Sequence, residues 1–364
     1  MRLLIVVLIT VFLHGMAFAQ GLTRVMSGYS AISGPHAVLW VAREAGLFEK
    51  NGLRAEVAYI RSGSTMSQAL VAGEIQLAQT GGPAALAAGV AGFDVTLVAV
   101  ALNTTPIVIM GHVSKMEELR GKAIGITRFG SNTDMSARYA IRKFGLQPEK
   151  DVALVQLEDY PGIMGGMQSG RIAAGALADP FTDHAKKLGY KEIADIAALG
   201  LEFPFVSIVT KKSYLREHAD IAQRFVRAYA EAIAVYKNNR EVAMKVTSKY
   251  TGIKDPAILS STIDFYAPKL ARIPYPTIGG IRFILDQIAA RDPKAKNVNP
   301  ESFMDTRFVK QLEESGLFKS SIPKGKARYL LRFRRSLKPV VTFPTASFVP
   351  ERDPAKSRWG RERR

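Results

Sequence analysis

Short apolar runs alternate with segments of helical periodicity through the first two hundred residues. Residues 54–60 alternate apolar and polar side chains, as a half-exposed strand does, whereas 37–48 carry apolar residues at helical spacing. Strands that alternate with helices of 10–15 residues are typical of parallel βαβ units, so the pattern predicts an α/β fold. The predicted strands are 23–29, 54–60, 75–79, 95–100, 107–111, 123–127, 152–157, 174–177 and 205–210.

One local pattern occurs twice at a fixed offset. A helical segment ends at Gly73, a short apolar run follows, and Pro83 opens the next helix; Gly170 and Pro180 repeat this arrangement 97 residues later. Two similar α/β units in one chain predict two lobes with a cleft between them. Small ligands bind in clefts of this kind.

Beyond the strand at 205–210 the pattern turns helical, with apolar stripes in 220–236, 240–249, 256–266 and 278–290. We interpret the strand as the return of the chain to the first lobe. This predicts a first lobe made of 20–107 plus 207–321 and a second lobe, 108–206, inserted into it. Trp40 and Phe48, on a helical stripe of the first lobe, are predicted core residues.

The two ends of the chain differ from the body. Arg2, the apolar run 3–13 and the small-x-small site at 17–19 predict that 1–19 is a cleaved signal peptide, which implies a periplasmic protein. The alternative, a membrane anchor, needs about 20 apolar residues. In 322–364 periodicity fades while Pro and Arg accumulate, which predicts a basic, disordered tail.

Composition narrows the function. The chain has no Cys, which excludes disulfides and thiolate chemistry. Of the net charge of +18, residues 319–364 carry +11, so the body is only mildly basic and we expect no nucleic-acid partner. The five His residues are scattered, and no P-loop or nucleophile elbow occurs. We therefore predict no catalytic residue, no metal and no cofactor.

Several segments together resemble the NMT1/THI5-like substrate-binding proteins, which include sulfonate, nitrate and taurine binders of ABC importers. They are 34–53 (GPHAVLWVAREAGLFEKNGL), 69–75 (ALVAGEI), 119–125 (LRGKAIG), 128–131 (RFGS) and 145–152 (GLQPEKDV). The resemblance covers about 23–317. It implies a type II periplasmic-binding-protein fold, a small-molecule ligand and delivery to an ABC permease in the inner membrane, and we expect a monomer.

Two other functions stay open at this level. Relatives of this group include an enzyme that makes a pyrimidine precursor for thiamine by consuming its own histidine, and a binding protein can also sense a ligand without transporting it. The ligand itself is open between an anion such as a sulfonate, nitrate or taurine and an aromatic, pyrimidine-type compound. His36 resembles a His of the pyrimidine-precursor binders; a surface or capping role is the alternative.

Candidate ligand-binding residues follow from the topology. Ligands of open α/β sheets bind at the carboxyl ends of strands, where helix N-termini favour anions. In the first lobe the candidates are Ser30, Ser33, Gly34, His36, Ser62, Gly63, Ser64, Thr65, Thr80, Gly81, Gly82 and Thr105. In the second lobe they are Arg128, Gly130, Ser131, Asn132, Thr133, Asp159 and Asp179.

The charged candidates point to different ligands. Arg128 would pair with an anion, whereas Asp159 and Asp179 would favour a cationic or hydrogen-bond-donating group. For any one residue, capping its own helix is the structural alternative, as for Asp179 before Pro180.

Overall fold

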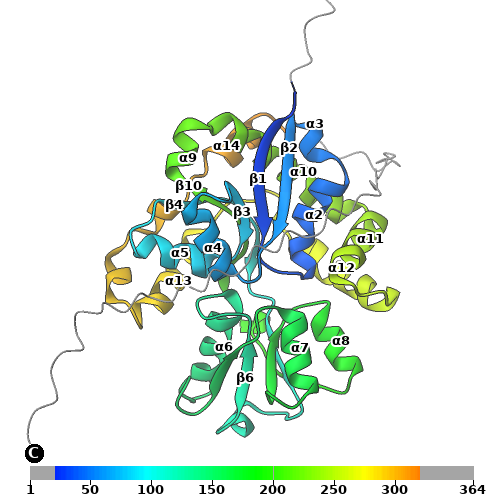
Figure 1. Cartoon of the computed structure of the whole chain (residues 1–364), viewed down its shortest axis with the longest axis vertical. Helices are drawn as coiled ribbons and strands as arrows, with labels where there is room; N and C mark the ends of the chain where they lie inside the picture. The colour runs from blue at the N-terminus through cyan, green and yellow to red at the C-terminus, as the bar shows by residue number, and fades with distance from the viewer. Residues whose placement is uncertain (1–20, 200, 320–364) are drawn as a thin grey trace, which may run out of the picture.

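The computed structural model describes residues 21–199 and 201–319, which form two lobes, each built on a five-stranded mixed sheet (Figure 1). The first sheet has the order β2-β1-β3-β10-β4 and the second β7-β6-β8-β5-β9. The strands of the first are β1 (Thr23–Tyr29), β2 (Leu53–Tyr59), β3 (Leu77–Thr80), β4 (Val95–Thr104) and β10 (Glu202–Lys211). Those of the second are β5 (Val108–Gly111), β6 (Ala123–Ile126), β7 (Ala153–Gln156), β8 (Ala174–Leu177) and β9 (Lys191–Asp195).

The two sheets share one plan. In each, the first three strands of the order are parallel, and the fourth strand runs antiparallel to its neighbours. That fourth strand is β10 in the first sheet and β5 in the second, and each follows directly on a strand of the other lobe. The lobes are therefore joined by two crossing segments, between β4 and β5 and between β9 and β10.

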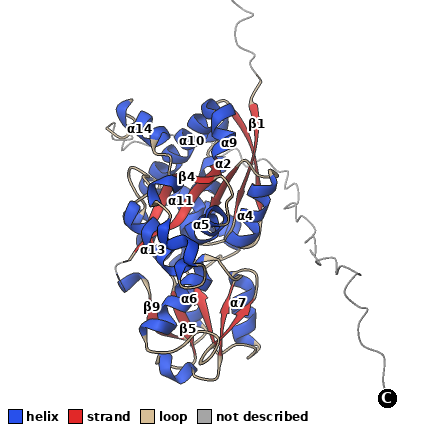
Figure 2. Cartoon of the chain, turned by 90° about the vertical axis from the view of Figure 1, so that its left-hand side faces the viewer, coloured by secondary structure: helices blue, strands red, loops and turns tan. Residues whose placement is uncertain are grey.

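Helices cover the sheets, and most of the later ones pack on the first lobe (Figure 2). The first lobe begins with η1 (Gly34–His36), α2 (Ala37–Glu44), α3 (Leu47–Lys50), α4 (Gly63–Ala72) and α5 (Gly82–Val90). The second contains η2 (Met116–Leu119), α6 (Asn132–Lys143), α7 (Tyr160–Gln168), α8 (Phe181–Lys187) and η3 (Ala197–Leu199). The rest are α9 (Lys212–Glu217), α10 (Ala219–Asn238), α11 (Arg240–Thr251), α12 (Pro256–Lys269), α13 (Ile278–Ala289), η4 (Pro293–Asn297), η5 (Pro300–Phe303) and α14 (Arg307–Glu314).

The repeat in the sequence corresponds to equivalent elements of the two lobes. Strand β8 begins 97 residues after β3, and α7 begins 97 residues after α4. Gly73 and Gly170, which follow these helices, have φ angles of +85° and +72°, a left-handed conformation that a side chain would strain. The sequence pattern therefore marks the same helix–turn–strand unit in both lobes.

Aromatic pairs pack the helices of the first lobe against one another. The Trp40 ring is fully buried and stacks on Tyr250 of α11, with ring centroids 4.6 Å apart and an interplanar angle of 5°. Phe48 is also buried and contacts Phe225 of α10. Both rings were predicted to be core residues, and this is confirmed. The stacked pair of Trp40 and Tyr250 adds about 0.5–1.5 kcal/mol to the free energy gained by burying the rings.

The structure also differs from the sequence predictions. Strand β10 begins at Glu202, so the predicted boundary between residues 206 and 207 falls inside a strand of the first sheet. Strand β9 and helix α14 were not predicted. The predicted signal peptide, 1–19, and the predicted tail, 322–364, lie outside the described residues. Within the described ranges, no helix combines the length and the apolar character that crossing a bilayer requires.

Candidate functional site

A small cavity lies between the lobes at the carboxyl ends of their parallel strands. The first lobe contributes Ser30, Ala31, His36, Ser62, Gly63 and Gly81 to its wall. The second lobe contributes Thr127, Asn132, Thr133 and Tyr160. The volume is about 20 Å³, enough for about one water molecule. Ligand sites span about 300–1,000 Å³, so the lobes must separate before a small organic molecule can enter.

On the first-lobe side, the helix N-termini at the cavity have no side-chain cap. Ser62 precedes α4 and Gly81 precedes α5, and neither forms a capping hydrogen bond through a side chain. The first N–H groups of a helix have no partner within the helix. The Thr80 hydroxyl, behind Gly63, is buried and has no hydrogen-bond partner. This wall therefore offers unused donors and the positive end of two helix dipoles.

On the second-lobe side, the chain caps its own helices. The Ser131 hydroxyl accepts a hydrogen bond from the Asp134 N–H of α6 at 3.4 Å. The Asp159 carboxylate accepts one from the Gly162 N–H of α7 at 2.9 Å. The Thr133 hydroxyl accepts a hydrogen bond from the Thr127 N–H at 2.9 Å. Donors on this wall are thus partly occupied, and the two walls differ chemically.

Asn132 contacts the first lobe directly. Its side-chain amide donates to the Phe205 carbonyl of β10 at 2.9 Å, while its Oδ1 is buried without a partner. A Cβ atom added to Gly81 would lie 2.0 Å from this Oδ1. Only glycine at position 81 allows the two lobes to approach as closely as they do here.

His36 is a neutral member of the wall. Its Nδ1 lies 2.9 Å from the Ser33 hydroxyl, and its ring meets the Phe205 ring edge-on at 6.2 Å. Burial lowers the pKa of His36 to about 3, so the imidazole is uncharged at neutral pH. A neutral imidazole has one donor and one acceptor nitrogen and can orient a ligand by hydrogen bonding without an ion pair.

None of the charged candidates lines the cavity, and two of them, Arg128 and Asp159, belong to a group of charged contacts between the lobes that we call the rim. The Arg128 guanidinium donates through Nη2 to Glu158 at 3.2 Å, while its Nε is buried without a hydrogen-bond partner, so the predicted partner of an anion is only partly paired within the protein. Arg61 of the first lobe contacts Glu158 at 2.9 Å and Asp159 at 3.3 Å across the cleft. Tyr59 adds a hydrogen bond from its hydroxyl to Asp159 at 3.4 Å. These contacts link the lobes at the rim.

Asp179 lies at a second inter-lobe contact. Its backbone carbonyl accepts a hydrogen bond from the Gly34 N–H at 2.8 Å. A Cβ atom on Gly34 would lie 2.5 Å from the Tyr266 ring, so the packing of η1 against α12 within the first lobe requires glycine at this position. Burial, and then the negative charge of Asp183, raise the pKa of Asp179 to about 7.

The cavity brings together seven of the predicted residues, namely Ser30, His36, Ser62, Gly63, Gly81, Asn132 and Thr133. The predicted residues outside its wall are Ser33, Gly34, Ser64, Thr65, Thr80, Gly82, Thr105, Arg128, Gly130, Ser131, Asp159 and Asp179. Among them, the Thr105 hydroxyl bonds to Ser136 at 3.0 Å beside a crossing segment, and Gly82 packs against Pro204.

Three residues of the cavity wall, Ala31, Thr127 and Tyr160, were not predicted. Thr127 directly follows β6 and Tyr160 opens α7, positions equivalent in kind to those of the candidates. The other wall residues were predicted as small polar residues at strand ends. Tyr160 has a large aromatic side chain and did not meet this criterion. The offset of 97 residues could have predicted Tyr160, because it opens α7 at the position equivalent to that of Gly63 in α4.

Known proteins share this fold. The structure of the alkanesulfonate-binding protein SsuA from Xanthomonas axonopodis pv. citri, bound to MOPS, superimposes with a TM-score of 0.68 at 18% identity, covering 79% of this chain and 100% of that one. The periplasmic nitrate-binding protein NrtA from Synechocystis PCC 6803 gives a TM-score of 0.68 at 15% identity, covering 84% and 92%. The predicted two-lobed periplasmic-binding-protein fold is thereby confirmed.

Comparisons of the amino-acid sequence also find binding proteins as relatives. A Bacillus subtilis protein with the name "Putative binding protein YtlA" is 24% identical over 254 residues, which cover 67% of this chain and 75% of that protein. The profile of the NMT1-like family matches residues 19–248. The relatives that match are binding proteins, and an extracytoplasmic location is in keeping with them. The chain belongs to the NMT1-like family.

Proposed function

We propose that this protein is the solute-binding component of an ABC importer, which captures a small organic anion in the inter-lobe cleft and delivers it to a permease. The observation that carries the proposal is the pair of uncapped helix N-termini, those of α4 and α5, at the cavity. Backbone N–H groups and helix dipoles together form an anion site without a cationic side chain. A sulfonate or carboxylate head group fits this chemistry.

The wall supports an anion over a cation. None of its residues is acidic, and His36 is neutral because burial lowers its pKa. The carboxylates of Glu158 and Asp159 are engaged by Arg61 at the rim. A cationic ligand would therefore lose its hydration in the cleft without gaining a counter-charge there.

The asymmetry between the walls suggests how the ligand is oriented. The head group would bind the first lobe, where donors are unused, and the body of the ligand would face Asn132 and Tyr160 of the second lobe. Closure would then bring the Asn132 amide onto the Phe205 carbonyl and complete the contacts at the rim. A ligand that bridges both walls stabilises the closed arrangement by hinge motion at the crossing segments.

A thermal-shift screen tests the proposal. Butanesulfonate, taurine, nitrate and benzoate are compared with butylamine, each over a concentration series. An anion at 100 times its dissociation constant should stabilise the fold by about 2.7 kcal/mol, whereas butylamine should have no effect. Stabilisation by the amine alone would contradict an anion site.

A negative charge introduced at the α4 N-terminus tests whether the anion binds there. Ser64→Asp adds a carboxylate at the second position of α4, which favours the helix but repels an anion at its N-terminus. Ala257→Asp adds the same charge at the second position of α12 and does not line the cavity. We expect Ser64→Asp alone to weaken anion binding, by about tenfold or more. An equal loss in both variants would indicate a general charge effect.

A further inference from the structure

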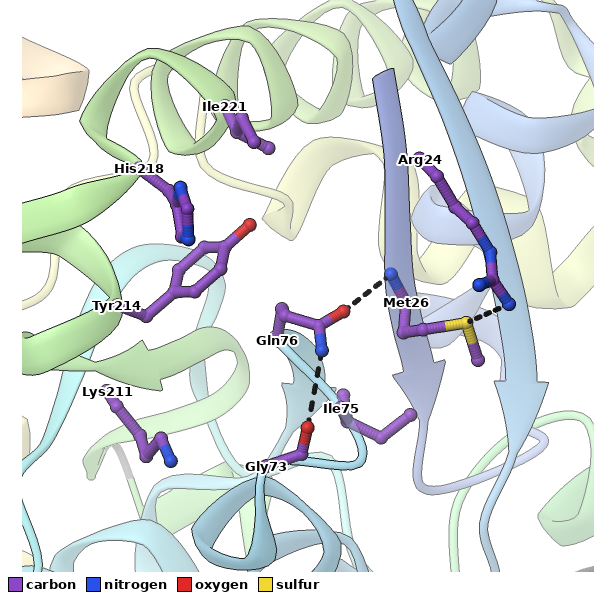
Figure 3. A pocket seen from close by; sticks show the side chains of 9 residues that line it. All are labelled: Arg24, Met26, Gly73, Ile75, Gln76, Lys211, Tyr214, His218 and Ile221. Atoms are coloured by element: carbon purple, nitrogen blue, oxygen red, sulfur yellow. Dashed lines mark hydrogen bonds between the residues drawn. The ribbon is translucent and has the colours of Figure 1, made fainter. Parts of the chain in front are cut away.

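A larger pocket, drawn in Figure 3, lies in the first lobe beside the start of β1, the end of that strand remote from the second lobe (Figure 1). Its volume is about 440 Å³, within the range of small-molecule sites. Arg24 and Met26 of β1 form one side of it. Strand β1 runs from there to Tyr29, and Ser30 of the inter-lobe cavity follows it. At about 3.3 Å per residue, Ser30 lies about 20 Å along the chain from Arg24 and about 13 Å from Met26. The pocket is therefore separate from the proposed transport site.

Three segments far apart in the sequence build this pocket. The Gln76 side chain accepts a hydrogen bond from the Met26 N–H at 2.7 Å and donates one to the Gly73 carbonyl at 3.3 Å, which holds the loop before β3 against β1. Strand β10 ends at Lys211, and the helices α9 and α10 that follow form the opposite wall. Tyr214 and His218 pack ring against ring there, at 4.7 Å.

The lining of this pocket has a positive charge bias. It includes the cations Arg24 and Lys211 and no acidic side chain. Arg24 is paired with Glu56 at 2.8 Å, outside the lining. The Lys211 ammonium has three donors, and the hydrogen bond shown for it within the described residues is a long one, 3.5 Å, to the Val71 carbonyl. The Lys211 charge also acts on the Asp94 carboxylate, which lies outside the lining, but within the described residues no ion pair is shown for Lys211, so it is the lining cation that can turn toward an anion.

The remaining surface suits the body of a ligand. Met26, Ile75 and Ile221 supply apolar side chains, and the Tyr214 hydroxyl points into the space between Ile221 and Gln76 (Figure 3). Burial, and then Asp220, raise the pKa of Tyr214 to about 12, so the hydroxyl keeps its proton and can donate.

From this arrangement we propose a second binding site, in which Lys211 holds the head group of a small organic carboxylate while its aromatic or aliphatic body contacts Met26, Ile75 and Ile221 and lies beside the Tyr214 side chain. The site combines a cation, a neutral donor and an apolar floor, the composition typical of pockets for amphipathic anions. It does not depend on the proposed transport function, because it shares no residue with the inter-lobe cavity.

The test follows methyl groups by NMR. The purified protein, labelled at Met and Ile methyl groups, is titrated with benzoate and, separately, with benzylamine. We expect the signals of Met26, Ile75 and Ile221 to shift and saturate with benzoate and not with benzylamine. Assignment uses Met26→Leu and Ile221→Val. Absence of saturable shifts at these methyls, or equal shifts with benzylamine, would overturn the proposal.

Matched variants assign the binding to Lys211. Lys211→Gln should weaken benzoate binding at these methyls about tenfold, whereas Lys212→Gln, the exposed neighbour that does not line the pocket, should leave it unchanged. Tyr214→Phe provides a second, milder variant in case Lys211→Gln unfolds, and it should weaken binding about threefold. Benzoate affinity unchanged in every folded variant overturns the proposal. Anion binding in the cleft, followed at Met66 of α4, should be the same in Lys211→Gln and wild type, so failure of either site is recognised separately.

Discussion

Replacing Gly81 with Ala should prevent the lobes from closing while leaving each lobe intact. Gly81 has φ −80° and ψ 151°, angles that alanine adopts without strain, so the first lobe itself tolerates the change. In the closed arrangement, however, the new Cβ would lie 2.0 Å from the Asn132 Oδ1. Asn132 would have to move and give up its 2.9 Å hydrogen bond to the Phe205 carbonyl.

The magnitude follows from these two effects. Loss of the hydrogen bond costs about 1 kcal/mol, and overpacking at a tight contact costs about 1–3 kcal/mol. Closure therefore becomes less favourable by about 2–4 kcal/mol. Because ligand binding is coupled to closure, affinity should fall about 30-fold or more.

Calorimetric titration with the anion that gives the largest thermal shift measures this loss, and small-angle scattering reports whether the ligand still makes the protein more compact. The control is Gly165→Ala, an exposed helical glycine of α7 with no atom within 4 Å of the added Cβ. Asn132→Ala should cost little more in the Gly81→Ala background, because both changes remove the same contact. Affinity within about threefold of wild type in Gly81→Ala would refute the reasoning.

Three further predictions concern the rim, the inter-lobe acid and the core. Arg61→Ala removes an exposed ion pair with Glu158 and a longer, partly buried one with Asp159, so calorimetry should show at most about a fivefold loss of ligand affinity, smaller still in 0.5 M salt; a loss above about 50-fold would contradict a largely screened interaction. The raised pKa of Asp179 means that the folded state binds a proton more tightly than the unfolded state, so its contribution to stability is present below about pH 4 and is lost as pH rises through about 7. Asp179→Asn should therefore melt about 3 °C or more above wild type at pH 8, with a much smaller difference at pH 4; equal melting temperatures at both pH values would contradict the raised pKa. Trp40→Ala, at a fully buried stacked ring, should lower the free energy of unfolding by about 3–5 kcal/mol in urea denaturation, and a loss under about 1 kcal/mol would contradict its core role.

The architecture was accessible from the sequence because it rests on local signals. The glycines at 73 and 170 have left-handed backbone angles, which is why the pattern recurs at an offset of 97. Strand β9 was missed because it lies at the edge of its sheet. Its sequence, KEIAD, has mostly polar side chains and no clear alternation. The start of β10 was missed because Pro204 interrupts its apolar run.

The candidate site was accessible only in part. Strand ends predicted Ser30, Gly81 and Asn132, since parallel strands present their carboxyl ends at one edge. The pairing of Arg128 with Glu158 depends on the turn before α7, and no local pattern predicts it. The remote pocket was not predictable, because residues 24, 76 and 211 meet only through the sheet register and the return of the chain by β10.

A crystal structure of the protein with the tightest-binding anion from the thermal-shift screen tests the central claim most directly. We predict closed lobes with the anionic head group within hydrogen-bond distance of the backbone N–H groups at the start of α4 and α5. An anion bound only in the remote pocket at Lys211, or a head group held by the second lobe alone, would contradict the account.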